Sequence, residues 1–150
     1  MTKVSAVGTK GTEKVGLLPP HIHILSSERP IPLKRHRSTR SGHMYDPSSK
    51  DKSNYIKSIK KQLPTKPLSG PLRVNIHFVF KSNIYKKDGS FRKGKDDSHV
   101  CKPDLSNLIK FYEDALTGYL WNDDCQIVEI QSFKIRGKKD SVFICVEEDV

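Results

Sequence analysis

The chain has 150 residues, of which 27 are Lys or Arg and 17 are Asp or Glu, so its formal charge at pH 7 is +10. An apolar fraction of 35%, with nine prolines and nine glycines, allows one modest domain with a small core and excludes a membrane span. The charge is uneven, because residues 1–100 carry a net +14 and residues 101–150 a net −4; nucleic acid is therefore the expected partner.

The N-terminal residues 1–20 are predicted to form a disordered tail that ends at two prolines. This segment lacks the apolar core of a secretory signal, so we expect a cytoplasmic protein. The folded domain is predicted to span residues 21–150 and to open with a strand at residues 21–25, where apolar residues alternate with period two. His21 and His23 share one face of this strand, but an isolated His-x-His pair is more typical of a surface than of a metal site.

A basic segment follows at residues 29–40, and its prolines argue against regular structure. Its charges are too costly to bury, so we expect an exposed loop that binds DNA phosphates. The candidate phosphate contacts are Arg29, Lys34, Arg35, Arg37 and Arg40. Any one of them, taken alone, is more typical of a solvated surface charge.

The middle of the chain predicts a helix, a strand and a long loop. An apolar stripe with lysines around it predicts a helix that Ser48 or Ser49 can cap and that Pro64 ends. Strict alternation at residues 72–80 predicts a strand with one face in the core. The polar residues 81–99 predict a flexible basic loop.

The C-terminal third predicts a second helix and two more strands. The helix is expected at residues 105–116, with Gly118 placed to end it. The strands are expected at residues 126–136 and 141–147, joined by a turn at 137–140. This order of elements predicts a single small α/β domain of the α+β kind, with a mixed β-sheet and two main helices.

Acidic residues around the second helix are the main functional signal. Asp104 precedes the helix, where backbone N–H groups and the helix dipole stabilise a carboxylate. A helix of about 11 residues spans roughly 16 Å, so a chain that turns at Gly118 and returns as a strand can bring Asp124 beside Asp104. Lys110 lies on the polar side of the helix and can hold a scissile phosphate. An N-cap aspartate, a solvated lysine and a turn that favours Asp explain the same residues structurally, so both interpretations stay open here.

Three sequence blocks, in a fixed order, favour the functional explanation of these acids and of Lys110. They are Lys102–Lys110, Asp114–Gly118 and Trp121–Glu129. They resemble the RusA family of Holliday junction resolvases, whose pattern is Lys/Arg-Pro-Asp-x-Asp-Asn-x-x-Lys, Asp-Ala-Leu and aromatic-x-Asp-Asp-x-Gln-Val. Residues 29–47 are similar to that family's opening loop, so the resemblance covers about residues 21–146. It implies a RusA-like fold and a homodimer that acts on four-way DNA junctions as a crossover junction endodeoxyribonuclease.

The resemblance also implies roles for individual residues. Asp104 and Asp124 correspond to catalytic carboxylates that hold Mg²⁺, for which Mn²⁺ is a substitute, and Lys110 corresponds to the essential lysine. Lys102 is a further candidate DNA contact. The bound ion would activate a water that attacks phosphorus in line, and Lys110 would stabilise the added charge.

Ser106 departs from the family pattern, because it stands where the family has its second motif aspartate. Ser106, Asp123 and Glu129 are further candidate metal ligands, although Glu129 lies at an odd offset from Asp124 that favours the opposite face of a strand. Three outcomes are open: an active enzyme in which Glu129 or Asp123 compensates, an enzyme with weaker metal affinity, or a branched-DNA-binding protein that does not cleave.

Two alternatives to a DNA enzyme or binder are weaker. An RNA-binding protein would be expected to show paired aromatic residues for base stacking, which this sequence lacks. Neither a zinc site nor a disulfide framework is predicted. The chain has three cysteines, Cys101, Cys125 and Cys145, which is an odd number, and none of them forms a Cys-x-x-Cys motif.

Overall fold

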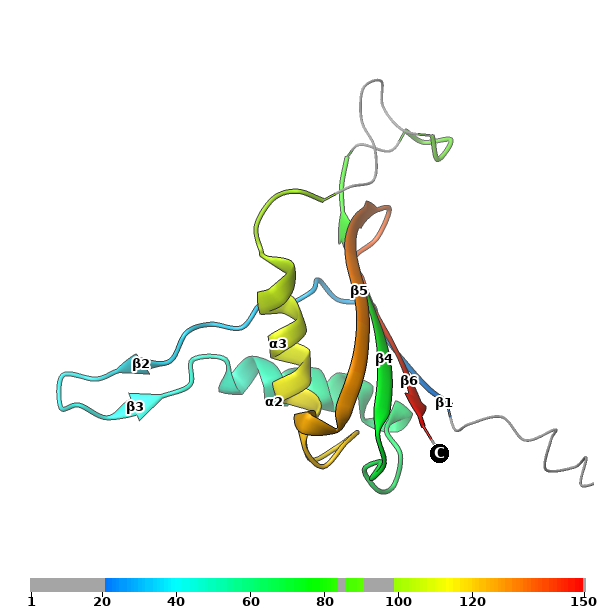
Figure 1. Cartoon of the computed structure of the whole chain (residues 1–150). Coiled ribbons are helices and arrows are strands. Elements are labelled where there is room, and N and C mark those ends of the chain that lie inside the picture. The colour runs from blue at the N-terminus through cyan, green and yellow to red at the C-terminus, as the bar shows by residue number, and fades with distance from the viewer. Residues whose placement is uncertain (1–20, 84–85, 91–98, 150) are drawn as a thin grey trace, which may run out of the picture.

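The computed structural model describes residues 21–83, 86–90 and 99–149. Its centre is a four-stranded mixed sheet in the order β1-β6-β4-β5. The strands are β1 (His21–Ser26), β4 (Leu72–Lys81), β5 (Ile127–Gly137) and β6 (Ser141–Glu148). β4 runs parallel to β5 and antiparallel to β6, which is antiparallel to β1. Figure 1 shows the two long helices on one face of the sheet, so the predicted small α/β domain with a mixed sheet is confirmed.

Both predicted helices are present. They are α2 (Ser49–Ile59), which continues as the short 3-10 helix η1 (Lys60–Gln62), and α3 (Leu105–Leu116). Ser48 is the N-cap residue of α2, but its hydroxyl accepts a hydrogen bond from the backbone N–H of Lys34 (2.8 Å) instead of capping the helix. Gly118 follows α3 with φ +90°, a conformation that glycine adopts without strain, so it ends this helix as predicted.

The core lies between the sheet and the helices. Alternate residues of β4 from Leu72 to Phe80 are at most 1% exposed, which confirms the predicted alternation. From α3, Phe111 and Leu116 are fully buried. Trp121 is also fully buried, and its indole N–H donates to Thr117 Oγ1 (3.1 Å). Each large apolar side chain buried in this way stabilises the fold by about 1.5–3 kcal/mol.

The chain does not pair β5 with β6 directly, because β4 lies between them. Residues 138–140 instead cross the end of β4, where Asp140 Oδ1 accepts a hydrogen bond from the backbone N–H of Lys81 (2.7 Å). A Cβ atom at Gly137 would lie 2.4 Å from Cγ1 of Val79. Glycine is therefore required for the chain to pass this close to β4.

The basic segment and the residues after it form an arm. Two short strands, β2 (Arg37–Ser38) and β3 (Met44–Tyr45), pair antiparallel within it. This regular pairing was not predicted, and it follows the prolines, which stand at positions 30 and 32. Figure 1 shows the arm extending away from the sheet beyond the start of α2.

The predicted disordered tail, residues 1–20, lies outside the described residues, as do 84–85 and 91–98 of the predicted loop. In the described part of that loop, residues 86–90 form a turn in which the backbone N–H of Gly89 donates to the carbonyl of Lys86 (3.0 Å). Among the helices of the described ranges, none is long and apolar enough to cross a membrane.

Candidate nucleic-acid and metal site

Asp104 is the N-cap residue of α3. Its carbonyl accepts a hydrogen bond from the backbone N–H of Leu108 (3.1 Å), but its carboxylate caps no backbone N–H. That side chain is 54% exposed, and its Oδ1 lies 3.2 Å from Nζ of Lys102, which is 86% exposed. An ion pair this exposed is worth about 0–1 kcal/mol. The Asp104 carboxylate is therefore available to a ligand or a cation.

Lys134 holds the segment that leads into Asp104. It lies on β5 in register with the buried Phe78, so it points toward the helices. Its ammonium donates to the carbonyls of Cys101 and Pro103, with a distance of 2.6 Å to Pro103 O. Hydrogen bonds from a charged donor contribute about 1.5–3 kcal/mol. Lys134 was not predicted as a site residue, and its signal in the sequence is a lysine on the core-facing side of a predicted strand.

His99 packs close to Lys134. Its ring stacks on Phe80 with 4.4 Å between centroids, and its buried Nδ1 has no hydrogen-bond partner among the residues that the structure describes. Burial lowers the pKa of His99 below its ordinary value, and the positive charge of Lys134 lowers it further. The guanidinium of Arg29 lies 5.0 Å from the centroid of the same Phe80 ring, so Arg29 is held at this end of the sheet.

Lys110 and Asp124 come together, although they lie on different elements. Lys110 Nζ is 3.6 Å from Asp124 Oδ2 and 3.6 Å from Oδ1 of Asp114, one turn further along α3. Asp114, followed by Asp124, raises the pKa of Lys110, so the ammonium stays charged. Asp104 precedes Lys110 by six residues, which is about 9 Å of helix axis. The described contacts join Asp124 to Lys110 and join Asp104 to Lys102.

Asp123 shapes the turn that carries Asp124. The turn is the 3-10 helix η2 (Asp124–Gln126), and Asp123 is its N-cap. The Asp123 Oδ1 accepts a hydrogen bond from the backbone N–H of Cys125 (2.9 Å), and this bond lowers the pKa of Asp123. Asp123 thus has a structural partner, whereas Asp124 presents its carboxylate to Lys110.

Gln126 ties this turn to the start of β4. Its Oε1 accepts hydrogen bonds from the backbone N–H groups of Asn122 (2.8 Å) and Asp123 (2.9 Å). Its Nε2 donates to the carbonyls of Leu68 and Gly70, both at 3.0 Å. The glutamine of the third sequence block therefore has a structural explanation, because it holds the turn in place.

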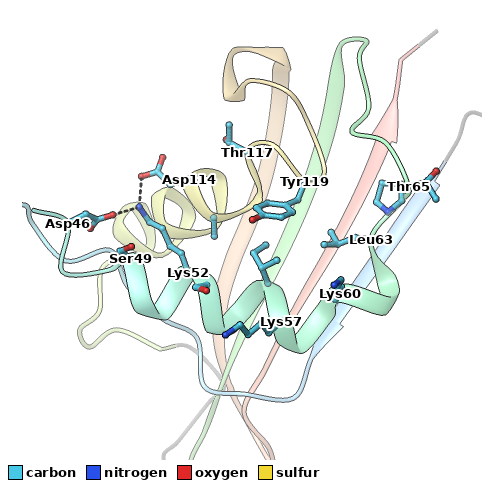
Figure 2. Close-up of a pocket in the computed structure, with 14 residues that line it drawn as sticks. Asp46, Ser49, Lys52, Lys57, Lys60, Leu63, Thr65, Asp114, Thr117 and Tyr119 are labelled. Carbon is cyan, nitrogen blue, oxygen red and sulfur yellow. Dashed lines mark hydrogen bonds and ion pairs between the residues drawn. The ribbon is translucent and has the colours of Figure 1, made fainter.

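A groove of about 750 Å³ lies between α2 and α3 (Figure 2), and Asp114 is among its lining residues. Lys52 of α2 reaches two carboxylates there, with Nζ 2.7 Å from Asp46 Oδ2 and 3.8 Å from Asp114 Oδ2. The hydrogen bond from Lys52 lowers the pKa of Asp46. Because Asp114 also contacts Lys110, positive and negative charges alternate from Asp46 to Asp124. The exposed side chains that line the groove further along include Lys57, Lys60 and Tyr119.

The predicted phosphate contacts lie in two places. Arg35, Arg37 and Arg40 are exposed on the arm that holds β2 and β3. Lys34 lies where the arm meets α2, with its Nζ 3.2 Å from Asp51 Oδ2. Arg29 lies near the crossing from β5 to β6, with Nη1 3.7 Å from Oδ1 of Asp140. The cations of this one segment are thus divided between the arm and the end of the sheet.

The donor chemistry of the site fits Mg²⁺. Asp104 and Asp124 offer hard oxygen ligands, and Mg²⁺ is usually held by one or two carboxylates together with waters and substrate phosphates. The Asp104 and Asp124 side chains are 54% and 39% exposed, so a hydrated ion can reach them. Within the described ranges, no three acids bring their oxygens within 4.8 Å of one another. The fit therefore rests on two carboxylates and not on a preassembled cage.

Two other candidate ligands lie in different surroundings. Ser106 is exposed in the first turn of α3, which contains no acidic residue. It precedes Lys110 by four residues, so both lie on the same face of the helix. Glu129 pairs in register with Arg73 and lies 2.5 Å from its Nη1. Arg73 alternates with buried residues of β4, which places Glu129 on the face of the sheet away from the helices.

The fold and the acids around α3 define a small two-layer α/β protein of the class that the three sequence blocks indicate. Residues 28–147 match the family described as endodeoxyribonuclease RusA. The chain is also 30% identical over 121 residues to the uncharacterized protein YqaN of Bacillus subtilis (strain 168). This match covers 74% of the present chain and 84% of YqaN. The chain therefore belongs to the RusA family of endodeoxyribonucleases, and this membership supports a Holliday junction resolvase.

Proposed function

We propose that the protein is a Mg²⁺-dependent endonuclease that hydrolyses phosphodiester bonds in four-way DNA junctions. Family membership supports the class of enzyme. The observation that carries the proposal at this chain's own site is the approach of Lys110 Nζ to Asp124 Oδ2, at 3.6 Å. This approach places a charged donor of α3 beside a carboxylate of the turn before β5. If Asp104 were only a helix cap and Lys110 only a solvated surface lysine, Lys110 would not need to lie beside Asp124.

In this proposal each residue of the site has a separate role. Asp104 and Asp124 would hold Mg²⁺, or Mn²⁺ as its substitute. When bound, the ion polarises the phosphate and makes a coordinated water more acidic. Lys110 binds a non-bridging phosphate oxygen and stabilises the charge that develops there. Lys134 and Gln126 keep the two carboxylate-bearing segments in place.

The cations supply affinity for the DNA backbone. The arm carries Arg35, Arg37 and Arg40, and the groove adds Lys57 and Lys60. Phosphate contacts of this kind release counterions, so junction binding should weaken steeply as salt rises. We propose that the enzyme acts in the cytoplasm. We also propose a homodimer, because symmetric cleavage of a two-fold junction needs two sites related by that symmetry.

Cleavage of a labelled four-way junction over a Mg²⁺ series tests the proposal. Asp104→Asn, Asp124→Asn and Lys110→Met should each lower the cleavage rate by about 10²-fold or more while the junction is still bound. Asp149→Asn is a matched control, because that carboxylate is 48% exposed and is paired with Arg73, away from this site. Wild-type rates in all three site variants would refute the assignment.

Ser106→Asp tests the residue that departs from the family pattern. A carboxylate in the first turn of a helix is favourable by about 0.3–1 kcal/mol, so the variant should fold. It would lie one turn from Lys110 and should lower the Mg²⁺ concentration needed for half-maximal cleavage. Asn54→Asp, which adds the same charge to an exposed position of α2, should not.

The alternative is a branched-DNA-binding protein that does not cleave, and Ser106 is the observation that favours it. Junction binding by the wild type without nicking in Mg²⁺ or Mn²⁺ would establish this alternative. Cleavage gained only in Ser106→Asp would show that the missing carboxylate is the reason.

A further inference from the structure

Outside the DNA site, the described residues contain a group of side chains that combines imidazole and thiol. His21 and His23 of β1 and Cys145 of β6 each place one potential ligand atom within 4.8 Å of the other two. None of these residues contributes to the site proposed for DNA. The group therefore calls for a separate explanation.

Strand register creates this group. His23 is paired with Cys145 and His21 with Glu147 across the antiparallel β1–β6 ladder. Ile24 and Val146, which neighbour these residues along the two strands, are fully buried in the core. Since side chains alternate along a strand, the four polar residues project together from the face away from the helices. Paired residues have Cβ atoms about 4.5–5.5 Å apart, so two histidines face a thiol and a carboxylate at contact range.

We propose that His21, His23 and Cys145 form a zinc site. Zn²⁺ prefers nitrogen and sulfur ligands at about 2.0–2.3 Å in a tetrahedron, which sets the ligand atoms about 3.3–3.8 Å apart. The ligand atoms here already lie within 4.8 Å, so small side-chain rotations close the site. Mg²⁺ prefers oxygen ligands, so this site and the carboxylate site select different metals.

Glu147 has a positioning role in this site. Its Oε2 lies 2.9 Å from Nε2 of His21, so the carboxylate can accept the N–H of that nitrogen and leave Nδ1 of His21 for the metal. Histidine ligands commonly donate their second ring nitrogen to a carboxylate in this way. A water completes the tetrahedron as the fourth ligand.

The site has a structural consequence for the edge of the sheet. Among the strands of the described residues, β1 lies at the edge of the four-stranded sheet and pairs only with β6. A metal bound to both strands joins the start of the folded domain to its last strand. Since the ligands come together only in the folded chain, binding should stabilise the fold.

Zinc titration of the full, chelator-stripped protein tests the site. Native mass spectrometry should show one zinc per chain, and a hundredfold excess over Kd should raise Tm by about 5–10 °C. With Co²⁺ as the probe, a thiolate-to-metal charge-transfer band should appear. Failure of the wild type to bind zinc would overturn the proposal.

Variants identify the ligands. Cys145→Ser should abolish both the Co²⁺ charge-transfer band and the zinc-dependent rise in Tm, and His23→Ala should abolish that rise. Glu147→Gln should weaken binding by about 10–100-fold. The exposed thiols of Cys101 and Cys125 provide matched Cys→Ser controls, which should bind like the wild type.

The Tm of each variant without zinc separates ligand loss from misfolding, since it should equal that of the metal-free wild type. If Cys145→Ser keeps the band, or if Asp104→Asn removes zinc binding and Cys145→Ser does not, the site assignment is wrong.

Discussion

Gln126→Ala is expected to destabilise the protein by loosening the turn that carries Asp124. The side chain makes four hydrogen bonds, two from backbone N–H groups at 2.8 and 2.9 Å and two to carbonyls at 3.0 Å. The carbonyls of Leu68 and Gly70 are partly buried, so they lose partners that water replaces poorly. The exposed N–H groups of Asn122 and Asp123 recover hydrogen bonds to water.

The magnitude follows from these surroundings. Each partly buried bond contributes about 1–1.5 kcal/mol and each exposed one about 0.5 kcal/mol or less, which gives a loss of about 2–4 kcal/mol. For a chain of this size, each kcal/mol lowers Tm by about 2–4 °C. The loss of stability should be accompanied by slower junction cleavage, because Asp124 would no longer be held against Lys110.

Urea unfolding followed by tryptophan fluorescence measures this change. Trp121 is the single tryptophan and is fully buried just before the turn, so its emission reports on this region. Gln131→Ala is the matched control, because Gln131 lies on β5, the strand that follows the turn, and its side chain donates an exposed hydrogen bond to Glu129 (2.9 Å). That control should change stability by less than about 0.5 kcal/mol. Equal stability of the two variants would refute the role given to Gln126.

Three further changes test other parts of the structure. Gly137→Ala should lower the free energy of unfolding by about 1–3 kcal/mol, because the added methyl group overpacks against Val79. Adding Val79→Ala should recover part of this loss. Additive losses from the two changes in urea unfolding would contradict the close approach of Gly137 to Val79. A hydrogen bond from Lys52 lowers the pKa of Asp46 below its ordinary value of 3.8. The free energy of unfolding of the wild type should therefore exceed that of Asp46→Asn most at pH values above 3.8, and the difference should disappear as the pH falls through the lowered pKa. A difference that grows toward acid pH would show that this sign is wrong. Lys134→Met should slow cleavage more than it weakens junction binding, because the segment before α3 loses its hydrogen bonds to Lys134. Unchanged cleavage rates would show that Lys134 has no role in positioning Asp104.

Local sequence patterns predicted the main elements well. The alternation at residues 72–80 and the apolar stripe of residues 105–116 correspond closely to β4 and α3. Such patterns are readable because the period of a helix or a strand depends only on the neighbouring residues of the chain. The three sequence blocks were equally readable, and the family that they resemble is confirmed by the match over residues 28–147.

Strand order was not readable in this way. The turn at 137–140 suggests neighbouring strands, yet β4 lies between β5 and β6. The same order places Lys134 beside the residues that precede α3, where it holds two carbonyls. In the sequence, Lys134 is only an irregularity in an apolar pattern.

The sequence by itself determined that this is a small basic α/β protein of the RusA family and named the acids and the lysine around α3. Tertiary structure decided which of those residues meet: Lys110 contacts Asp124, Asp104 contacts Lys102, and Glu129 lies on the other face of the sheet. The reason is physical, since a side chain's neighbours across elements depend on strand order and register, which long-range packing selects. The same reason explains why Cys145 meets His23 only once β1 and β6 are paired.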